Sequence, residues 1–170
     1  MLLFFWRFRV KKIELILSLC YPKKDMKAAV QRVTKAAVSV EENLISQIGK
    51  GLVVFFCAEQ KDEIAKVSFL AKKIAHLRVF SDKEGKMNLS VKDVGGEILA
   101  ISQFTLCADV TQGNRPSFTT ALNFSLANTF YEAFCTELKK FNIPVKKGVF
   151  GADMKITQVN DGPVTIWYDI

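Results

Sequence analysis

Histidine is almost absent from this sequence, since His76 is the only one in 170 residues. A hydrolase of the triad type needs a histidine base. His76 falls inside a predicted helix, between Ala75 and Leu77. A structural role in the core or at the edge of the surface is a simpler interpretation there than a role as a catalytic base. A zinc site would have to gather four distant residues from this one histidine and the cysteines. The sequence therefore argues against a histidine-based triad and predicts no metal and no other cofactor.

The common phosphate-binding and catalytic patterns are missing as well. The chain contains neither G-x-x-x-x-G-K-[ST] nor G-x-G-x-x-G, which excludes the usual nucleotide-binding loops. Asp109, Asp153 and Asp161 fall in separate loops, so no pair of carboxylates is evident. Any chemistry must therefore rest on other groups.

The cysteines form no C-x-x-C pair. Cys20, Cys57, Cys107 and Cys135 are widely spaced, and three of them lie in apolar or helical surroundings. This pattern is typical of reduced core residues in a cytosolic protein.

Positive charge is concentrated at the N-terminus. Residues 1–25 contain six Lys/Arg and two Asp/Glu, so they supply +4 of the net charge of +7 and leave +3 for the other 145 residues. The same segment lacks the uninterrupted apolar run and the small-residue cleavage site of a signal peptide, and it is too short to span a bilayer. We predict an N-terminal extension outside the fold at 1–25, a single domain at 26–170, and a cytoplasmic protein without membrane contact.

From Met26 onward the hydrophobic pattern is regular and contains no repeat or linker. A continuous apolar run predicts a buried central strand at 52–58, and apolar residues at helical spacing predict one helix capped by Asp62 and a second that ends by Pro144. Three short strands are expected to close the chain at 145–151, 154–160 and 164–170. The predicted fold class is α/β: a three-layer α/β/β domain of strands, two strand–helix units and a three-strand meander, with two helices on one side of the sheet.

Three polar segments remain as candidate site elements: SQFTL (102–106), GNRPSFT (113–119) and NDGPVT (160–165). Each one alone is also what an ordinary turn or strand end needs, and NDGP taken by itself reads as a tight turn between two closing strands. The occurrence of all three in one chain is stronger evidence for a functional site than any one of them alone.

Together with QRV (31–33), GKMNLSV (85–91), RPSFT (115–119) and FGADM (150–154), these segments resemble the D-aminoacyl-tRNA deacylase family. The resemblance is collinear from Met26 to Ile170. It implies a cytoplasmic homodimer that hydrolyses the ester between a D-amino acid and the 3′-terminal adenosine of tRNA, and that also accepts glycine mischarged on tRNA. Three features depart from the family pattern: Cys107 replaces an aromatic residue, Cys57 replaces a small one, and residues 1–25 have no counterpart.

The resemblance also implies roles for individual residues. Gly162 and Pro163 form a cis peptide that reaches into the partner subunit's site and excludes L-amino acids, and Arg32 holds that loop in place. The expected catalytic residues are Ser102, Gln103, Phe104 and Thr105, and the expected substrate contacts are Leu106, Pro116, Met154 and Thr165.

Two mechanisms fit these residues. An aminoacyl ester is already activated, so water needs a positioned electrophile and backbone donors for the developing oxyanion. Thr105 could act as a nucleophile, but the sequence offers no base to activate it. The resemblance favours assistance by the 2′-hydroxyl of the substrate ribose.

Two other classes of function stay open at this point. A non-catalytic RNA-binding module would use Lys139, Lys140, Lys146 and Lys147 near the end of the second helix. A Ser/Thr esterase acting on small metabolites would need no tRNA. The sequence does not indicate which amino acid or tRNA is preferred.

Overall fold

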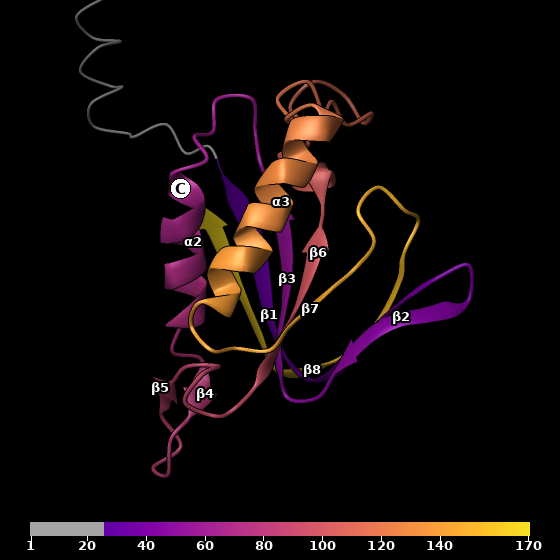
Figure 1. Cartoon of the computed structure of the whole chain (residues 1–170). Coiled ribbons are helices and arrows are strands. Elements are labelled where there is room, and N and C mark those ends of the chain that lie inside the picture. The colour runs from indigo at the N-terminus through magenta and orange to yellow at the C-terminus, as the bar shows by residue number, and fades with distance from the viewer. Residues whose placement is uncertain (1–25) are drawn as a thin grey trace, which may run out of the picture.

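The computed structural model describes residues 26–170, so the predicted extension at 1–25 lies outside the described residues. Helices α2 (Lys66–Ala75) and α3 (Phe124–Lys139) lie side by side on one face of a twisted sheet (Figure 1). The predicted α/β class with two helices on one side of the sheet is confirmed. Within residues 26–170, no helix has the length and apolar character needed to cross a membrane.

The main sheet is mixed and is organised around its long first strand. Its order is β2–β1–β3–β6–β7, and β8 pairs with the other edge of β1. Strands β3, β6 and β7 are parallel to one another, whereas β1 is antiparallel to β2, β3 and β8. The strands of this sheet are β1 (Lys27–Val40), β2 (Asn43–Ile48), β3 (Gly51–Cys57), β6 (Glu97–Ser102), β7 (Val145–Lys147) and β8 (Lys155–Asp169). A separate hairpin joins β4 (Phe80–Ser81) to β5 (Met87–Leu89).

Strand β3 is buried on both faces, as its apolar sequence predicts. Leu52, Val54 and Phe56 face the helices, where the ring of Phe56 stacks on Phe134 with centroids 4.6 Å apart. Val53 points the other way, into a second apolar cluster that includes Val33, Val38 and Ile48 from β1 and β2. The helices, the β3–β6 sheet and the far halves of β1, β2 and β8 therefore form three layers.

The start of α2 differs from the sequence prediction. Asp62 does not cap the helix, because its Oδ2 accepts a hydrogen bond from the backbone N–H of Glu59 at 2.6 Å and so closes the preceding turn. The helix begins at Lys66, and Ala65 occupies the cap position without a side-chain hydrogen bond. Helix α3 has a conventional start, since Asn123 Oδ1 accepts from the Leu126 N–H at 3.1 Å.

The predicted three-strand meander at the C-terminus is wrong. Only Val145–Lys147 forms a separate strand, and Lys155–Asp169 is one continuous strand along β1. Between the pairs Gln31–Thr165 and Val33–Asn160, β1 advances by two residues and β8 by five. NDGP is therefore a bulge within β8, not a turn between two strands, because the long edge of β1 keeps both flanks paired.

Gly51 is required by the close approach of β3 to β6. A Cβ atom there would lie 1.9 Å from the carbonyl oxygen of Glu97. We expect Gly51→Ala to lower the free energy of unfolding by about 3 kcal/mol or more, since backbone must move in a packed sheet. Gly49→Ala is the matched control, because the nearest atom to its Cβ is 3.8 Å away. Denaturant unfolding of both variants checks this, and an unchanged Gly51→Ala midpoint would contradict the strand geometry.

Candidate active site

The SQFTL segment (Ser102–Leu106) begins at the carboxyl end of a central parallel strand. β6 ends at Ser102, and the chain then turns into the short 3₁₀ helix η1 (Phe104–Cys107). The Gln103 N–H donates to the Phe56 carbonyl at 2.8 Å, which attaches the start of this turn to β3. Carboxyl ends of parallel strands are the usual place for ligand sites in α/β folds.

A pocket of about 480 Å³ opens beside this segment. Three parts of the chain form it: the end of β6, the start of α3 with the residues before it, and the segment between β7 and β8 that continues into β8. Its lining residues are Ser102, Gln103, Phe104, Ala121, Leu122, Phe124, Ala127, Phe150, Gly151, Ala152, Asp153, Met154 and Ile156. The volume suits a small organic group such as an aminoacyl moiety.

Aromatic packing fixes the apolar wall of the pocket. The rings of Phe124 and Phe150 meet edge to face at 4.9 Å, and Gly151 leaves room for this contact because a Cβ there would lie 2.7 Å from the Phe124 ring. Behind them, the Tyr131 hydroxyl donates to the Ala100 carbonyl at 2.8 Å. Burial raises the pKa of Tyr131, so its hydroxyl stays protonated and holds α3 against β6.

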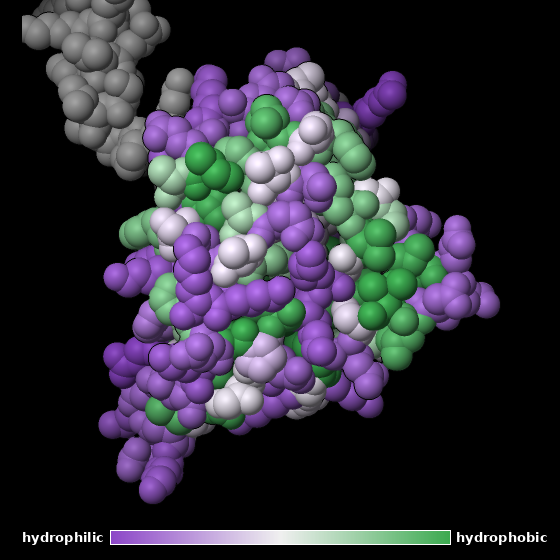
Figure 2. All heavy atoms as spheres, in the orientation of Figure 1, coloured by the Kyte–Doolittle hydropathy of each residue, from purple (hydrophilic) through white to green (hydrophobic). Residues whose placement is uncertain are grey.

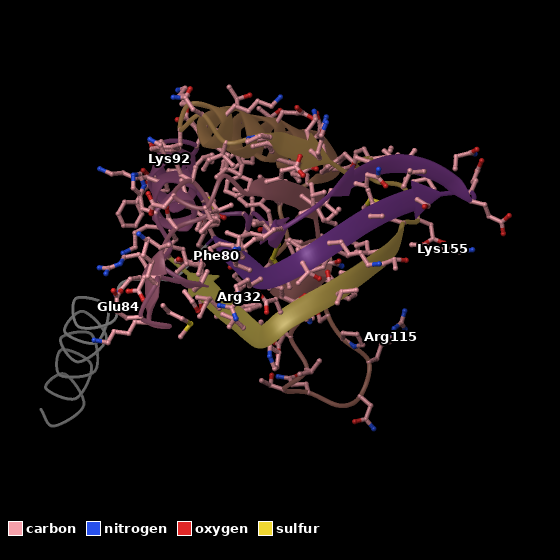
Figure 3. The ribbon with its side chains drawn as sticks, turned by 90° about the horizontal axis from the view of Figure 1, so that it is seen from below. Arg32, Phe80, Glu84, Lys92, Arg115 and Lys155 are labelled. Atoms are coloured by element: carbon pink, nitrogen blue, oxygen red, sulfur yellow. A yellow bond between two sulfur atoms is a disulfide. The ribbon has the colours of Figure 1, made fainter. Side chains whose placement is uncertain are left out.

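The structure brings some of the predicted site residues into the pocket and leaves others outside its lining. Ser102, Gln103, Phe104 and Met154 line it. Thr105 and Leu106 follow in η1. Pro116 lies in the exposed loop that also carries Arg115, which Figure 3 shows well away from Arg32.

Thr165 belongs to a polar cluster on β8. Its Oγ1 accepts from Gln31 Nε2 at 3.3 Å. Gln158 Nε2 donates to Gln31 Oε1 at 2.6 Å and to Asn160 Oδ1 at 2.7 Å. These contacts support the strand on both sides of the NDGP bulge.

The side-chain hydrogen-bond partner of the Thr105 hydroxyl is an amide and not a base. Its Oγ1 accepts a hydrogen bond from the side-chain amide of Gln103, which is a donor and not a proton acceptor at that nitrogen. His76 is exposed at the end of α2, where Nδ1 lies 2.9 Å from the Lys72 carbonyl oxygen and the ring contacts Phe141. No group of three or more His, Cys, Asp or Glu within residues 26–170 is placed to hold a metal ion.

Arg32 anchors the bulge that contains Gly162 and Pro163. Arg32 Nε donates to the Asp161 carbonyl at 3.0 Å and lies 3.2 Å from Asp161 Oδ2, and Nη1 donates to the Val79 carbonyl. Figure 3 shows Arg32 between β8 and the segment that carries Phe80. The Gly162–Pro163 peptide bond is cis, and Gly162 has a φ of 127°. Arg32 therefore ties the bulge to the β4 region.

The NDGP bulge is not part of the pocket lining within one subunit. Ser102 shares a row of the sheet with Phe56 and Ala28, whereas the bulge sits opposite Arg32, four residues further along β1. Gly162 and Pro163 are not among the residues that line the pocket of their own chain.

Sequence reasoning missed several pocket residues. Among the described residues that line the pocket, Asp153 is the only one with a titratable side chain, although its place in a loop apart from Asp109 and Asp161 had argued against a carboxylate pair. Phe150 and Asp153 both lie in the FGADM motif, which was the available signal. The sequence around Phe124 gave no such signal, because an aromatic residue at the start of a helix is as typical of core packing as of a pocket wall.

The cysteine prediction is wrong for two of the four residues. Cys57 and Cys107 are joined by a disulfide, with Cα atoms 6.9 Å apart. Their separation of 50 residues hid this contact, which only the packing of η1 against the end of β3 creates. Cys135 is a free buried thiol as predicted, and Cys20 lies outside the described residues.

Fold and site together define a small α/β domain with a substrate-sized pocket at the end of a parallel strand and no histidine base in it. The sequence model described as D-Tyr-tRNA(Tyr) deacylase matches residues 29–169. The chain belongs to this family.

Individual relatives agree with the family assignment. D-aminoacyl-tRNA deacylase from Ruegeria pomeroyi is 50% identical over 145 residues, which cover 85% of this chain and 100% of the relative. The Lacticaseibacillus casei protein of the same name is 50% identical over 144 residues, 85% of this chain and 97% of the relative. The solved structure titled c-Myc DNA Unwinding Element Binding Protein superposes with a TM-score of 0.80 at 42% identity, covering 85% of this chain and 98% of its own.

Proposed function

We propose that the pocket beside the SQFTL segment hydrolyses the ester between a D-amino acid and the 3′-terminal adenosine of tRNA. The products are free tRNA and the D-amino acid, so the protein is a carboxylic ester hydrolase. One observation carries the proposal: Ser102, Gln103 and Phe104 line a pocket of about 480 Å³ in a chain about half identical to D-aminoacyl-tRNA deacylases over most of its length. Hydrolysis of matched D- and L-aminoacyl-tRNA by the purified protein tests it.

The chemistry needs positioning more than acid–base groups. Water attacks the ester carbonyl, negative charge develops on the carbonyl oxygen, and the bond to the ribose 3′-oxygen then breaks. Backbone N–H groups at the start of a short helix have no partner within it and can stabilise that charge. The ribose 2′-hydroxyl assists the proton transfers, because the Thr105 hydroxyl is bonded to an amide and not to a base.

Chiral selection is the role of Gly162 and Pro163 in a homodimer. Neither residue is among those that line the pocket of their own chain, so we assign their action to the pocket of the partner subunit. There the backbone occupies the space that an L side chain requires, whereas a D-amino acid or glycine presents only hydrogen on that side. Arg32 is the positioning residue, through its bonds to Asp161 and Val79.

Exposed apolar surface supports association with a second copy. Figure 2 shows a hydrophobic patch where the segment after β7 lies beside β2. Leu44 and Ile45 of β2 and Val149, which follows β7, are exposed. Patches of this kind mark contact surfaces when they are rimmed by polar residues. We also propose a cytoplasmic location, since the proposed substrate is tRNA carrying a D-amino acid or glycine.

The domain is proposed to comprise residues 26–170, with 1–25 as an appendage. Met26 is fully buried, and its backbone pairs with Ile170 through hydrogen bonds of 2.8 and 3.0 Å. A chain that begins at Met26 is therefore expected to fold, dimerise and keep its deacylase activity within about twofold, because the Met26–Ile170 pairing that closes the domain is retained. Gel filtration and a deacylation assay check this. Loss of the folded dimer on truncation would show that the extension belongs to the fold.

A non-catalytic RNA-binding module is less well supported. Of the four lysines that it would use, Lys140 pairs with Glu137 and Lys147 with Glu132, at 2.5 and 2.7 Å. These ion pairs reduce the positive charge that the surface offers to phosphates. A Ser/Thr esterase would need a base beside its hydroxyl, and the partner of Thr105 is an amide.

A further inference from the structure

The Cys57–Cys107 disulfide lies next to the pocket. Cys57 is the last residue of β3, and Cys107 is the last residue of η1. Both side chains are nearly buried, at 3% and 4% exposed. Cys57 also lines a small second cavity together with Ser102 and Phe104 of the pocket wall. The bond therefore joins the segment that forms the polar wall of the pocket to the neighbouring strand.

Besides the disulfide, non-covalent contacts hold that segment: the Phe104 ring meets the Phe118 ring edge to face at 5.1 Å, and Cys57 Sγ lies 3.6 Å from the Phe104 carbonyl oxygen. The start of η1 is held to β3 by the hydrogen bond from Gln103 to Phe56, and its end by the Thr120 hydroxyl, which donates to the Cys107 carbonyl at 3.3 Å. Phe104 and Thr105 are exposed, and the residues after Cys107 form an exposed loop. Without the disulfide, η1 would be connected to β3 by non-covalent contacts alone.

Cys135 provides an internal contrast. It lies in α3, it is buried and free, and burial raises its pKa to about 12. A thiol with so high a pKa is inert at neutral pH. Cys107, in contrast, sits in a turn that reaches the surface, so local opening of η1 exposes it.

We propose that Cys57 and Cys107 form a reversible redox pair that controls the position of η1, and that the disulfide form is the more active deacylase. A covalent tie reduces the conformations open to the turn, so its backbone donors are better preorganised for the oxyanion. Disulfides in cytosolic proteins are usually transient and regulatory, in line with such a pair. The effect on turnover depends on the proposed function, whereas formation of the bond does not.

The oxidant is a low-molecular-weight disulfide of the glutathione class. One cysteine thiolate attacks its S–S bond, which forms a mixed disulfide and releases one small thiol. The second thiolate then attacks the protein sulfur of the mixed disulfide and releases the second small thiol. Two protein S–H bonds are replaced by one S–S bond, and the oxidant takes up two electrons and two protons.

The first test measures the bond itself in the full-length protein. The protein is equilibrated in mixtures of reduced and oxidised glutathione, free thiols are blocked with N-ethylmaleimide, and the digest is analysed for linked peptides. We expect a Cys57–Cys107 linked peptide whose amount follows the glutathione ratio, and a melting temperature on the order of 10 °C higher for the oxidised protein. Absence of this peptide at every ratio overturns the proposal.

The second test measures turnover of D-aminoacyl-tRNA in both redox states. We expect the oxidised protein to be at least about threefold faster, because a better positioned donor lowers the barrier. The turnover rate of a Cys57→Ala/Cys107→Ala variant should be the same under oxidising and reducing conditions and equal to that of the reduced natural protein. Cys135→Ala should show the same rate difference between the two conditions as the natural protein. Equal turnover rates for the oxidised and reduced natural protein overturn the proposal that the disulfide controls its activity.

A third measurement separates failure of this proposal from failure of the proposed function. Hydrolysis in neither redox state refutes the deacylase function. Hydrogen exchange at the amides of Phe104–Cys107 then decides the redox proposal alone: we expect slower exchange in the oxidised protein, and identical exchange in both states overturns it.

Discussion

A tRNA that ends in 2′-deoxyadenosine, with the D-amino acid on the 3′-oxygen, is expected to be hydrolysed on the order of a hundred times more slowly than the natural substrate, or slower still. Removal of a proton-transfer partner has an effect of about this size. Thr105→Ala, in contrast, should retain activity within about tenfold, since it loses one hydrogen bond and keeps its backbone N–H. Single-turnover rates of both substrates with both proteins make the comparison.

The opposite pattern would establish covalent catalysis. Full activity on the deoxy substrate together with an inactive Thr105→Ala variant would make Thr105 the nucleophile. Asp153→Asn is the control for a third mechanism, in which a carboxylate acts as the base, because Asp153 is the only carboxylate among the described residues that line the pocket. Retained activity in this variant excludes a carboxylate base and leaves the 2′-hydroxyl as the assisting group.

Gly162→Ala is expected to reduce discrimination between D- and L-aminoacyl-tRNA by about tenfold or more. A Cβ at this position would lie 2.9 Å from Arg32 Nη2 and 2.9 Å from Val164 Cγ2, and the φ of 127° disfavours an L side chain whatever the space. Backbone strain of this kind costs about 1–3 kcal/mol, and ~1.4 kcal/mol corresponds to tenfold in rate. The bulge must shift, so the backbone that excludes L side chains moves with it.

Gly95→Ala is the matched control for this variant. Gly95 also has a positive φ, 60°, but nothing lies within 4 Å of its Cβ and it has no assigned role. Both variants are assayed on D- and L-tyrosyl-tRNA, with gel filtration to show that the oligomeric state is unchanged. Unaltered discrimination in Gly162→Ala would remove Gly162 from the chiral filter.

The sequence predicts the layered core because burial periodicity is local information. The uninterrupted apolar run of β3 and the helical spacing in α2 and α3 correspond to their observed burial. The single strand β8 was missed because a turn-forming sequence was taken as a turn. Only the long edge of β1, a non-local feature, shows that Asp161–Val164 is accommodated as a bulge.

In the candidate site too, the sequence predicts what depends on local residues and misses what depends on packing between distant segments. The SQFTL segment could be found because polar residues end an apolar strand, and the structure places its first three residues in the pocket lining. The Cys57–Cys107 bond and the contribution of Asp153 depend on packing between segments far apart in the chain. Spacing along a sequence carries no signal for such contacts.

Hydrolysis of D-tyrosyl-, L-tyrosyl- and glycyl-tRNA by the full-length protein under single-turnover conditions tests the account most directly. We expect the D- and glycyl esters to be cleaved at least about 100-fold faster than the L ester, a difference of ~2.7 kcal/mol that a steric clash with rigid backbone readily supplies. Equal rates on the D and L esters would contradict the chiral filter, and no cleavage of any of the three would contradict the deacylase function itself.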